Sequence, residues 1–294
     1  MGAQCCRNEP IIDPTSTKII CLKESNQRYF IHIFDCNSET SNEIEINPNL
    51  FDIKNLSQIS QDNTLFLLGQ DNTETESSSI FIVINTIQSP ISITFEQPPI
   101  HIHNKPSLCF YSDEELYVIG GINTTECEMY SIKDKKWNEL PQLPSERYGC
   151  SVISVKESHS IILYGGGKDN NDDILIYNKE KQWEILTKID IQLKRSFSGI
   201  SSYNNTIFIF GGVDSITNES SDEIISVNMN KVEKIEKYQI KMSKSSKWEK
   251  MFSYGCYNGV FYLFDEESFT IYKVDINYHK SEVIDFYHGK DMEY

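Results

Sequence analysis

A short apolar stretch that ends in a pair of glycines occurs three times in this chain at a nearly constant interval. The copies are LYVIGG at residues 116–121, ILYGG at 162–166 and IFIFGG at 207–212. The second glycines are Gly121, Gly166 and Gly212, so successive copies lie 45 and 46 residues apart. Self-similarity at one fixed period is typical of repeat architectures, and it constrains where strands, turns and loops lie.

The residues that follow each glycine pair also recur. A predicted strand carries a tyrosine, a polar turn leads to a tryptophan, and a further strand begins with an arginine. These residues are Tyr130, Trp137 and Arg147 in one copy and Tyr177, Trp183 and Arg195 in the next. Short β-branched and aromatic runs separated by Asn, Asp, Gly and Ser predict strands joined by hairpins.

Together these features resemble the kelch repeat, most clearly over residues 105–215 and in degraded form elsewhere. The resemblance implies an all-β fold in which four-stranded antiparallel blades surround a central channel. Within it the glycine pairs serve close backbone packing and the aromatic residues serve packing between blades. These structural residues are Gly120, Gly121, Tyr130, Trp137, Gly165, Gly166, Tyr177, Trp183, Gly211 and Gly212.

Strand spacing extends the repeat beyond the clear motifs. Predicted second strands begin near Lys18, Thr64, Glu115, Ser160, Thr206 and Gly259, and third strands near Tyr29, Ile80, Glu126, Asp173, Glu223 and Phe269. Six units would average 49 residues in a chain of 294, close to the kelch period of about 50 residues. We therefore expect a six-bladed propeller as a single domain over residues 15–294, after a flexible segment at 1–14. Helix should be scarce, with one turn at most in 239–249.

The first unit lacks an obvious first strand, because little chain precedes Lys18. In propellers of this kind one terminus usually adds a strand to the blade that the other terminus begins. Either residues 9–12 or the tail after Phe286 would close the ring in this way, and we favour the N-terminal segment.

Composition narrows the possible locations and partners. The chain has 27 Lys and Arg against 43 Asp and Glu, a net charge of −16. Such a chain repels the phosphates of nucleic acids and an anionic membrane surface. It has no apolar run of about 18 residues and no secretory signal. We expect a reducing, cytoplasmic location, with the 8 cysteines mostly free and Cys21, Cys109 and Cys150 in the core.

Arg147 and Arg195 are the candidate partner-binding residues. In kelch domains an arginine at this place lies near the channel mouth, and some family members use it to bind acidic peptide segments. Lys105 and Lys250 stand at comparable places in this chain. A cationic cluster in an acidic protein would focus its field on an anionic ligand. The alternative for both arginines is an internal ion pair with loop carboxylates.

The sequence predicts neither a metal site nor a cofactor. His101 and His103 are the only close histidine pair, and an alternation of period two would place both on one strand face. Two such ligands without a nearby third are a weak signal for a metal. No catalytic motif accompanies the repeat. An enzyme with an active site at the channel mouth, oxidase-like or hydrolase-like, is the alternative to a non-enzymatic protein.

The N-terminus carries a possible lipid anchor. Gly2 is the acceptor position for myristate, and Cys5 and Cys6 are placed for palmitate, although the usual pattern has Ser or Thr where Cys6 stands. One myristoyl chain binds membranes only marginally, so a second chain is needed for stable anchoring. Dual acylation, on the cytoplasmic face of a membrane, is therefore an alternative to an unmodified N-terminus.

The expected function is that of a monomeric interaction module or scaffold that binds another protein. The binding face would consist of the loops that join second to third strands and the loops that join successive blades, because loops on a rigid scaffold carry function. These loops are residues 121–126, 167–173 and 212–222, together with 141–147, 187–195 and 239–249.

Overall fold

A computed structural model shows how the repeats are arranged. It describes residues 18–25, 28–46, 53–71, 78–155, 158–167, 173–178, 182–188, 194–214, 217, 219–221, 223–239, 251–257, 259–265, 270–277 and 280–285. The predicted acylation sites Gly2, Cys5 and Cys6 lie outside these residues. So do the predicted ring-closing segments, 9–12 and the tail after Phe286, and most of the predicted helical turn.

All regular elements in the described part of the chain are strands, and the main sheets are antiparallel. The first sheet contains β1 (Lys18–Ser25), β2 (Arg28–Asp35) and β3 (Thr40–Ile46). The second contains β4 (Ile53–Gln61), β5 (Thr64–Asp71), β6 (Ser79–Asn85) and β7 (Ser92–Glu96). The third contains β8 (Ser107–Ser112), β9 (Glu115–Ile119), β10 (Cys127–Ser131) and β11 (Lys136–Leu140).

Later sheets repeat the same up-and-down order. The fourth contains β12 (Ser151–Val155), β13 (Ser160–Tyr164), β14 (Asp173–Asn178) and β15 (Glu184–Lys188). The fifth contains β17 (Gly199–Tyr203), β18 (Thr206–Phe210), β20 (Glu223–Asn228) and β21 (Lys231–Gln239). The sixth contains β22 (Met251–Tyr257), β23 (Val260–Asp265), β24 (Thr270–Asp275) and β25 (Lys280–Asp285). A small additional pair joins β16 (Arg195–Ser196) to β19 (Val213–Asp214).

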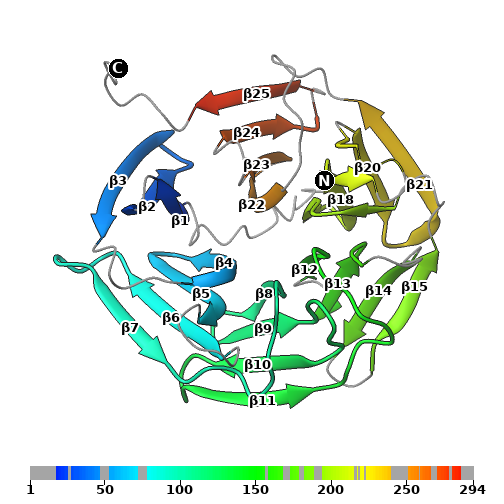
Figure 1. The fold of residues 1–294 in the computed structure, drawn as a ribbon. Coiled ribbons are helices and arrows are strands. Elements are labelled where there is room, and N and C mark those ends of the chain that lie inside the picture. The colour runs from blue at the N-terminus through cyan, green and yellow to red at the C-terminus, as the bar shows by residue number, and fades with distance from the viewer. Residues whose placement is uncertain are drawn as a thin grey trace, which may run out of the picture.

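These sheets lie side by side around a common centre, as Figure 1 shows. Strands such as β4, β8, β12 and β22 lie nearest the centre, and β3, β7, β11, β15, β21 and β25 lie at the rim. The first and last sheets pack against each other: Ile19 and Phe34 share a buried cluster with Phe264 and Ile271. The tyrosine hydroxyl of Tyr262 also donates a hydrogen bond to the carbonyl of Cys36, at 3.1 Å. The arrangement is consistent with a kelch propeller.

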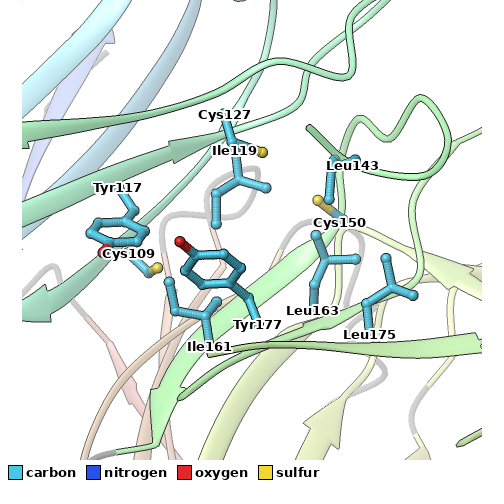
Figure 2. Packing of buried hydrophobic residues seen from close by; sticks show 10 residues of the cluster. All are labelled: Cys109, Tyr117, Ile119, Cys127, Leu143, Cys150, Ile161, Leu163, Leu175 and Tyr177. Carbon is cyan, nitrogen blue, oxygen red and sulfur yellow. The ribbon is translucent and has the colours of Figure 1, made fainter. Parts of the chain in front are cut away.

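The apolar second strands are buried on both faces because each sheet lies between two neighbours. In β9, Leu116 and Val118 pack toward the second sheet, whereas Tyr117 and Ile119 pack toward the fourth. Figure 2 shows the latter cluster, in which side chains of the third and fourth sheets interdigitate. A strand with two buried faces reads as a continuous apolar run, which is the pattern that precedes each glycine pair.

Backbone amides on the inner edge of the first sheet donate hydrogen bonds to side chains of the second sheet. The backbone amide of Leu22 donates to Oε1 of Gln58 at 2.7 Å, and the amide of Ile20 donates to Oγ of Ser60 at 3.2 Å. Both acceptor side chains are buried. Because an unpaired buried amide is costly, Gln58 and Ser60 of β4 provide part of the hydrogen bonding that an additional strand would give to β1. The repeat pattern of the sequence does not predict this role.

The described residues contain no helix that is both long enough and apolar enough to span a bilayer.

Candidate functional site

One end of the ring carries the loops that the sequence singled out. In the third sheet, the loop 120–126 leads from β9 to β10, and residues 141–150 lead from β11 to the next sheet. Since the strands alternate in direction, these two loops lie at the same end, and the hairpins 112–115 and 131–136 lie at the opposite end. We call the end with the loops 120–126 and 141–150 the loop face.

Two of the glycine pairs, Gly120–Gly121 and Gly165–Gly166, bind their sheet to the segment that begins the next sheet at the loop face. The amide of Gly121 donates to the carbonyl of Arg147 at 2.8 Å, and the amide of Gly166 donates to the carbonyl of Arg195 at 3.2 Å. Gly120 and Gly165, the first residues of these pairs, have φ values of +61° and +68°. A Cβ on Gly165 would lie 2.0 Å from the carbonyl oxygen of Arg195. Only glycine fits this conformation and this close approach.

Arg147 and Arg195 are buried at the same junctions. Each guanidinium donates to the carbonyl of the first glycine in its own sheet, Arg147 to Gly165 at 3.2 Å and Arg195 to Gly211 at 3.3 Å. Each also forms an ion pair with the first residue of the third strand, Asp173 for Arg147 and Glu223 for Arg195. Arg147 is 1% exposed and Arg195 is 3% exposed. The geometry is that of the internal ion pair, the alternative that the sequence left open, and binding of a partner by these arginines stays a prediction.

The prediction that Lys105 occupies a place comparable to the arginines is wrong. Gly149 and Phe197 lie two residues after Arg147 and Arg195, and both have a positive φ. Lys105 also has a positive φ, so the position equivalent to the arginines lies two residues before Lys105. That position is His103, four residues before β8, just as Arg147 and Arg195 are four residues before β12 and β17. The Nδ1 atom of His103 lies 2.8 Å from the carbonyl of Gly120, the same contact that the arginines make. Lys250 lies outside the described residues.

His103 forms a fully buried pair with Glu128 of β10. Its Nε2 atom lies 3.0 Å from Oε1 of Glu128, and both side chains are 0% exposed. Burial by itself raises the pKa of the Glu128 carboxyl, but the hydrogen bonds from His103 and from the amides of His101 and Ile100 outweigh it and lower that pKa. The two ring nitrogens of His103 thus face two acceptors, the Glu128 carboxylate and the Gly120 carbonyl.

The linker between β7 and β8, residues 97–106, is fixed along the third sheet by several such contacts. The amides of Ile100 and His101 donate to the two carboxylate oxygens of Glu128, at 2.7 and 2.8 Å. The Nε2 atom of His101 lies 2.9 Å from Glu139, and the hydrogen bond to Glu139 is the main reason that the pKa of His101 is raised. His101 and His103 therefore precede a strand instead of sharing a strand face, and each is paired with a carboxylate.

The motif aromatics lie between sheets. Trp137 and Tyr130 pack against Phe81 of the second sheet, with ring centroids 5.2 and 4.8 Å from it. The indole nitrogen of Trp137 donates to the carbonyl of Gln97 at 2.7 Å, and that of Trp183 donates to the carbonyl of Pro141 at 3.1 Å. Each tryptophan thus also holds the linker that enters its own sheet.

The described buried cysteines have thiols of low nucleophilic reactivity where burial raises the thiol pKa. Cys21, Cys109 and Cys150 are buried, as predicted. Burial is the main cause that raises the pKa of Cys109 and of Cys150, and it raises the pKa of Cys127 to about 12. These thiols are protonated at neutral pH, and a protonated thiol is a poor nucleophile. In the described part of the chain, no three His, Cys, Asp or Glu side chains gather as metal ligands would.

Comparison with known proteins gives the same class as the motifs. No family model matches the chain. The chain is 28% identical over 197 residues to Kelch-like protein 40 of Mus musculus, a match that covers 60% of this chain and 30% of that protein. It is also 28% identical over 214 residues to Kelch-like protein 40 of Xenopus tropicalis, covering 65% of this chain and 33% of the relative. The chain thus spans about a third of the length of the curated relatives it matches.

The antiparallel four-stranded sheets and their glycine-pair junctions define an all-β repeat protein of the propeller type. Together with the similarity to the relatives above, they support a protein of the kelch-repeat type.

Proposed function

We propose that this chain is a non-enzymatic protein-interaction module, a six-bladed kelch-type propeller that binds another protein through its loop face. The observation that carries the proposal is that hydrogen bonds and ion pairs hold the loop junctions of that face in place. In the third to fifth sheets, the glycine pairs and the residues Arg147, Arg195 and His103 hold the loop junctions by backbone and side-chain contacts. Loops held on a rigid scaffold suit recognition of a partner, because little conformational entropy is lost on binding.

The kelch-like relatives support this function, and the junction residues are engaged in holding the scaffold together. Arg147 and Arg195 are paired with carboxylates of their own sheets, and burial raises the pKa of the Cys109, Cys127 and Cys150 thiols, which keeps them protonated. These contacts favour a structural role for the polar groups of the junctions over the alternative of an enzyme at the channel mouth. The proposed count of six blades is supported by the similar size of the main sheets around the ring, and a structure with seven blades or with a helical domain would contradict that count.

The partner surface is tested by a matched pair of charge reversals. Glu146 lies in the loop 141–150 of the loop face, and Glu114 lies in a hairpin at the opposite end; both side chains are exposed. Tagged full-length protein carrying Glu146→Arg or Glu114→Arg is used for quantitative affinity capture from its native cells. We expect Glu146→Arg to lower partner recovery by about tenfold, since charge reversal at an interface creates an unfavourable contact. Equal recovery with both variants, or loss with Glu114→Arg alone, would contradict the proposal.

A cytoplasmic location and acylation at Gly2, Cys5 and Cys6 stay predictions from the sequence. Mass spectrometry of the N-terminal peptide tests the acylation, and an unmodified peptide would contradict it.

A further inference from the structure

In the linker 97–106, two isoleucine side chains are exposed while a histidine side chain is fully buried. Ile100 is 57% exposed and Ile102 is 53% exposed. Beside them, His103 is fully buried, and His101, whose side chain is 36% exposed, is held against Glu139. A surface segment normally places its apolar residues toward the protein and its polar residues toward water. Ile100, Ile102 and His103 have the opposite arrangement.

The inverted arrangement is fixed by specific contacts. Glu128 accepts hydrogen bonds from the amides of Ile100 and His101 and from the ring of His103. The carbonyl of Gln97 accepts a hydrogen bond from Trp137, and the carbonyl of Asn104 accepts one from the amide of Ile122. An apolar pair of similar size could replace a buried His–Glu pair without loss of stability. In this chain the His103–Glu128 pair and the backbone contacts together fix the linker in the conformation in which Ile100 and Ile102 are exposed.

Both isoleucines lie at the loop face. Their linker contacts Gly120 and Ile122 of the loop 120–126 through His103 and Asn104. Two residues of chain span at most about 7 Å, so the two Cα atoms are close together. The other strongly exposed apolar side chains, Ile87, Phe95 and Ile185, lie in or beside rim strands. Single exposed apolar residues of that kind are ordinary on protein surfaces.

Carboxylates surround the exposed pair. His101, between the two isoleucines, lies 2.9 Å from Glu139 and 4.0 Å from Glu126. The side chain of Glu139 is 66% exposed, and that of Glu126 is 28% exposed. The exposed cation of the linker, Lys105, follows farther along toward β8. The net charge of −16 repels a second copy of this chain, so the surroundings favour a basic partner.

We propose that Ile100 and Ile102 are the apolar anchors of the loop face, and that they receive a short segment of a partner protein. That segment carries an aliphatic or aromatic side chain flanked by lysine or arginine. Its apolar group is buried against the two isoleucines, and its cations approach Glu139 and Glu126. The inference rests on the proposed interaction function and specifies the site and the partner chemistry.

The test uses random 12-residue peptides displayed on phage and selected on the full chain. The best selected peptide is then synthesised, and its affinity is measured by fluorescence polarisation. We expect apolar residues beside Lys or Arg to be enriched, and the affinity to fall as salt rises, because the carboxylates are exposed. Ile100→Thr with Ile102→Thr should lower the affinity by about tenfold or more. Ile185→Thr, a 55% exposed residue on β15, should leave it within about twofold.

Several outcomes would overturn the inference. One is the absence of any enriched peptide, and another is equal binding of the selected peptide by the double variant. Self-association of the wild type that disappears in the double variant would identify a second copy as the occupant instead. A peptide that binds the double variant normally but fails to bind Glu146→Arg would refute the anchors while leaving the proposed function intact. Because both isoleucines are exposed, the double variant should unfold at the wild-type temperature, which serves as the folding control.

Discussion

Glu128→Ala is expected to lower the free energy of unfolding by about 3–5 kcal/mol, because it leaves the buried His103 without its carboxylate. The substitution also removes the acceptor for the amides of Ile100 and His101. Chemical denaturation at neutral pH measures the effect. Glu139→Ala is the matched control: this exposed carboxylate contacts the same linker through His101, and exposed pairs contribute less than about 1 kcal/mol. Equal effects of the two substitutions would show that the buried pair does not hold the linker.

The Glu128 prediction has a definite pH dependence. The pKa of this carboxyl is lower in the folded protein than its ordinary value of 4.5. Its ionised form therefore stabilises the folded state fully above pH 4.5, and that contribution is lost as the pH falls toward the lower folded-state pKa. The stability difference between wild type and Glu128→Ala should be largest near neutral pH and should shrink below pH 4.5. A difference that grows on acidification would contradict the assignment.

Gly165→Ala is expected to destabilise the protein by about 2–5 kcal/mol, the sum of left-handed backbone strain and overpacking. The residue has a φ of +68°, and its Cβ would meet the carbonyl oxygen of Arg195 at 2.0 Å. Gly259→Ala is the control, because Gly259 also has a positive φ, +80°, but its Cβ would meet the side chain of Asn277, which can move. Both variants carry the cost of a positive φ, but only Gly165→Ala adds the close contact with the Arg195 carbonyl. Comparing the two variants in thermal and chemical unfolding therefore separates these two costs. If Gly259→Ala is as harmful, the junction with Arg195 is not the cause.

The positions of the strands could be predicted from the sequence because the apolar second strands are buried on both faces. Thr64, Glu115, Ser160 and Thr206 begin strands as expected, and Asp173 and Glu223 begin third strands. Even the degraded units kept this spacing, since packing between neighbouring sheets demands an apolar strand in each of them. The motif residues alone would have covered only the middle of the chain.

The polar contacts of the junctions were less accessible to sequence reasoning. The sequence pattern assigns His103 only to a weak metal motif with His101. However, His103 lies four residues before β8, the same spacing that separates Arg147 and Arg195 from their strands. That spacing was a usable signal. Its partner Glu128 lies at a strand position that is occupied by Leu175 and Ile225 in the next two sheets. The repeat pattern therefore predicts an apolar residue there and not a buried carboxylate. Pairing of Gln58 with the backbone of Leu22 depends on contacts between sheets.

Site-specific photo-crosslinking in the native cells tests the central claim, that this propeller binds a protein through its loop face, most directly. A photoreactive amino acid replaces Gln142 in the loop 141–150 in one variant and Asp134 in the hairpin 131–136 at the opposite end in another; both side chains are exposed. We predict a discrete crosslinked protein from position 142 and none from position 134. Crosslinking from position 134 alone, or from neither position, would contradict the account.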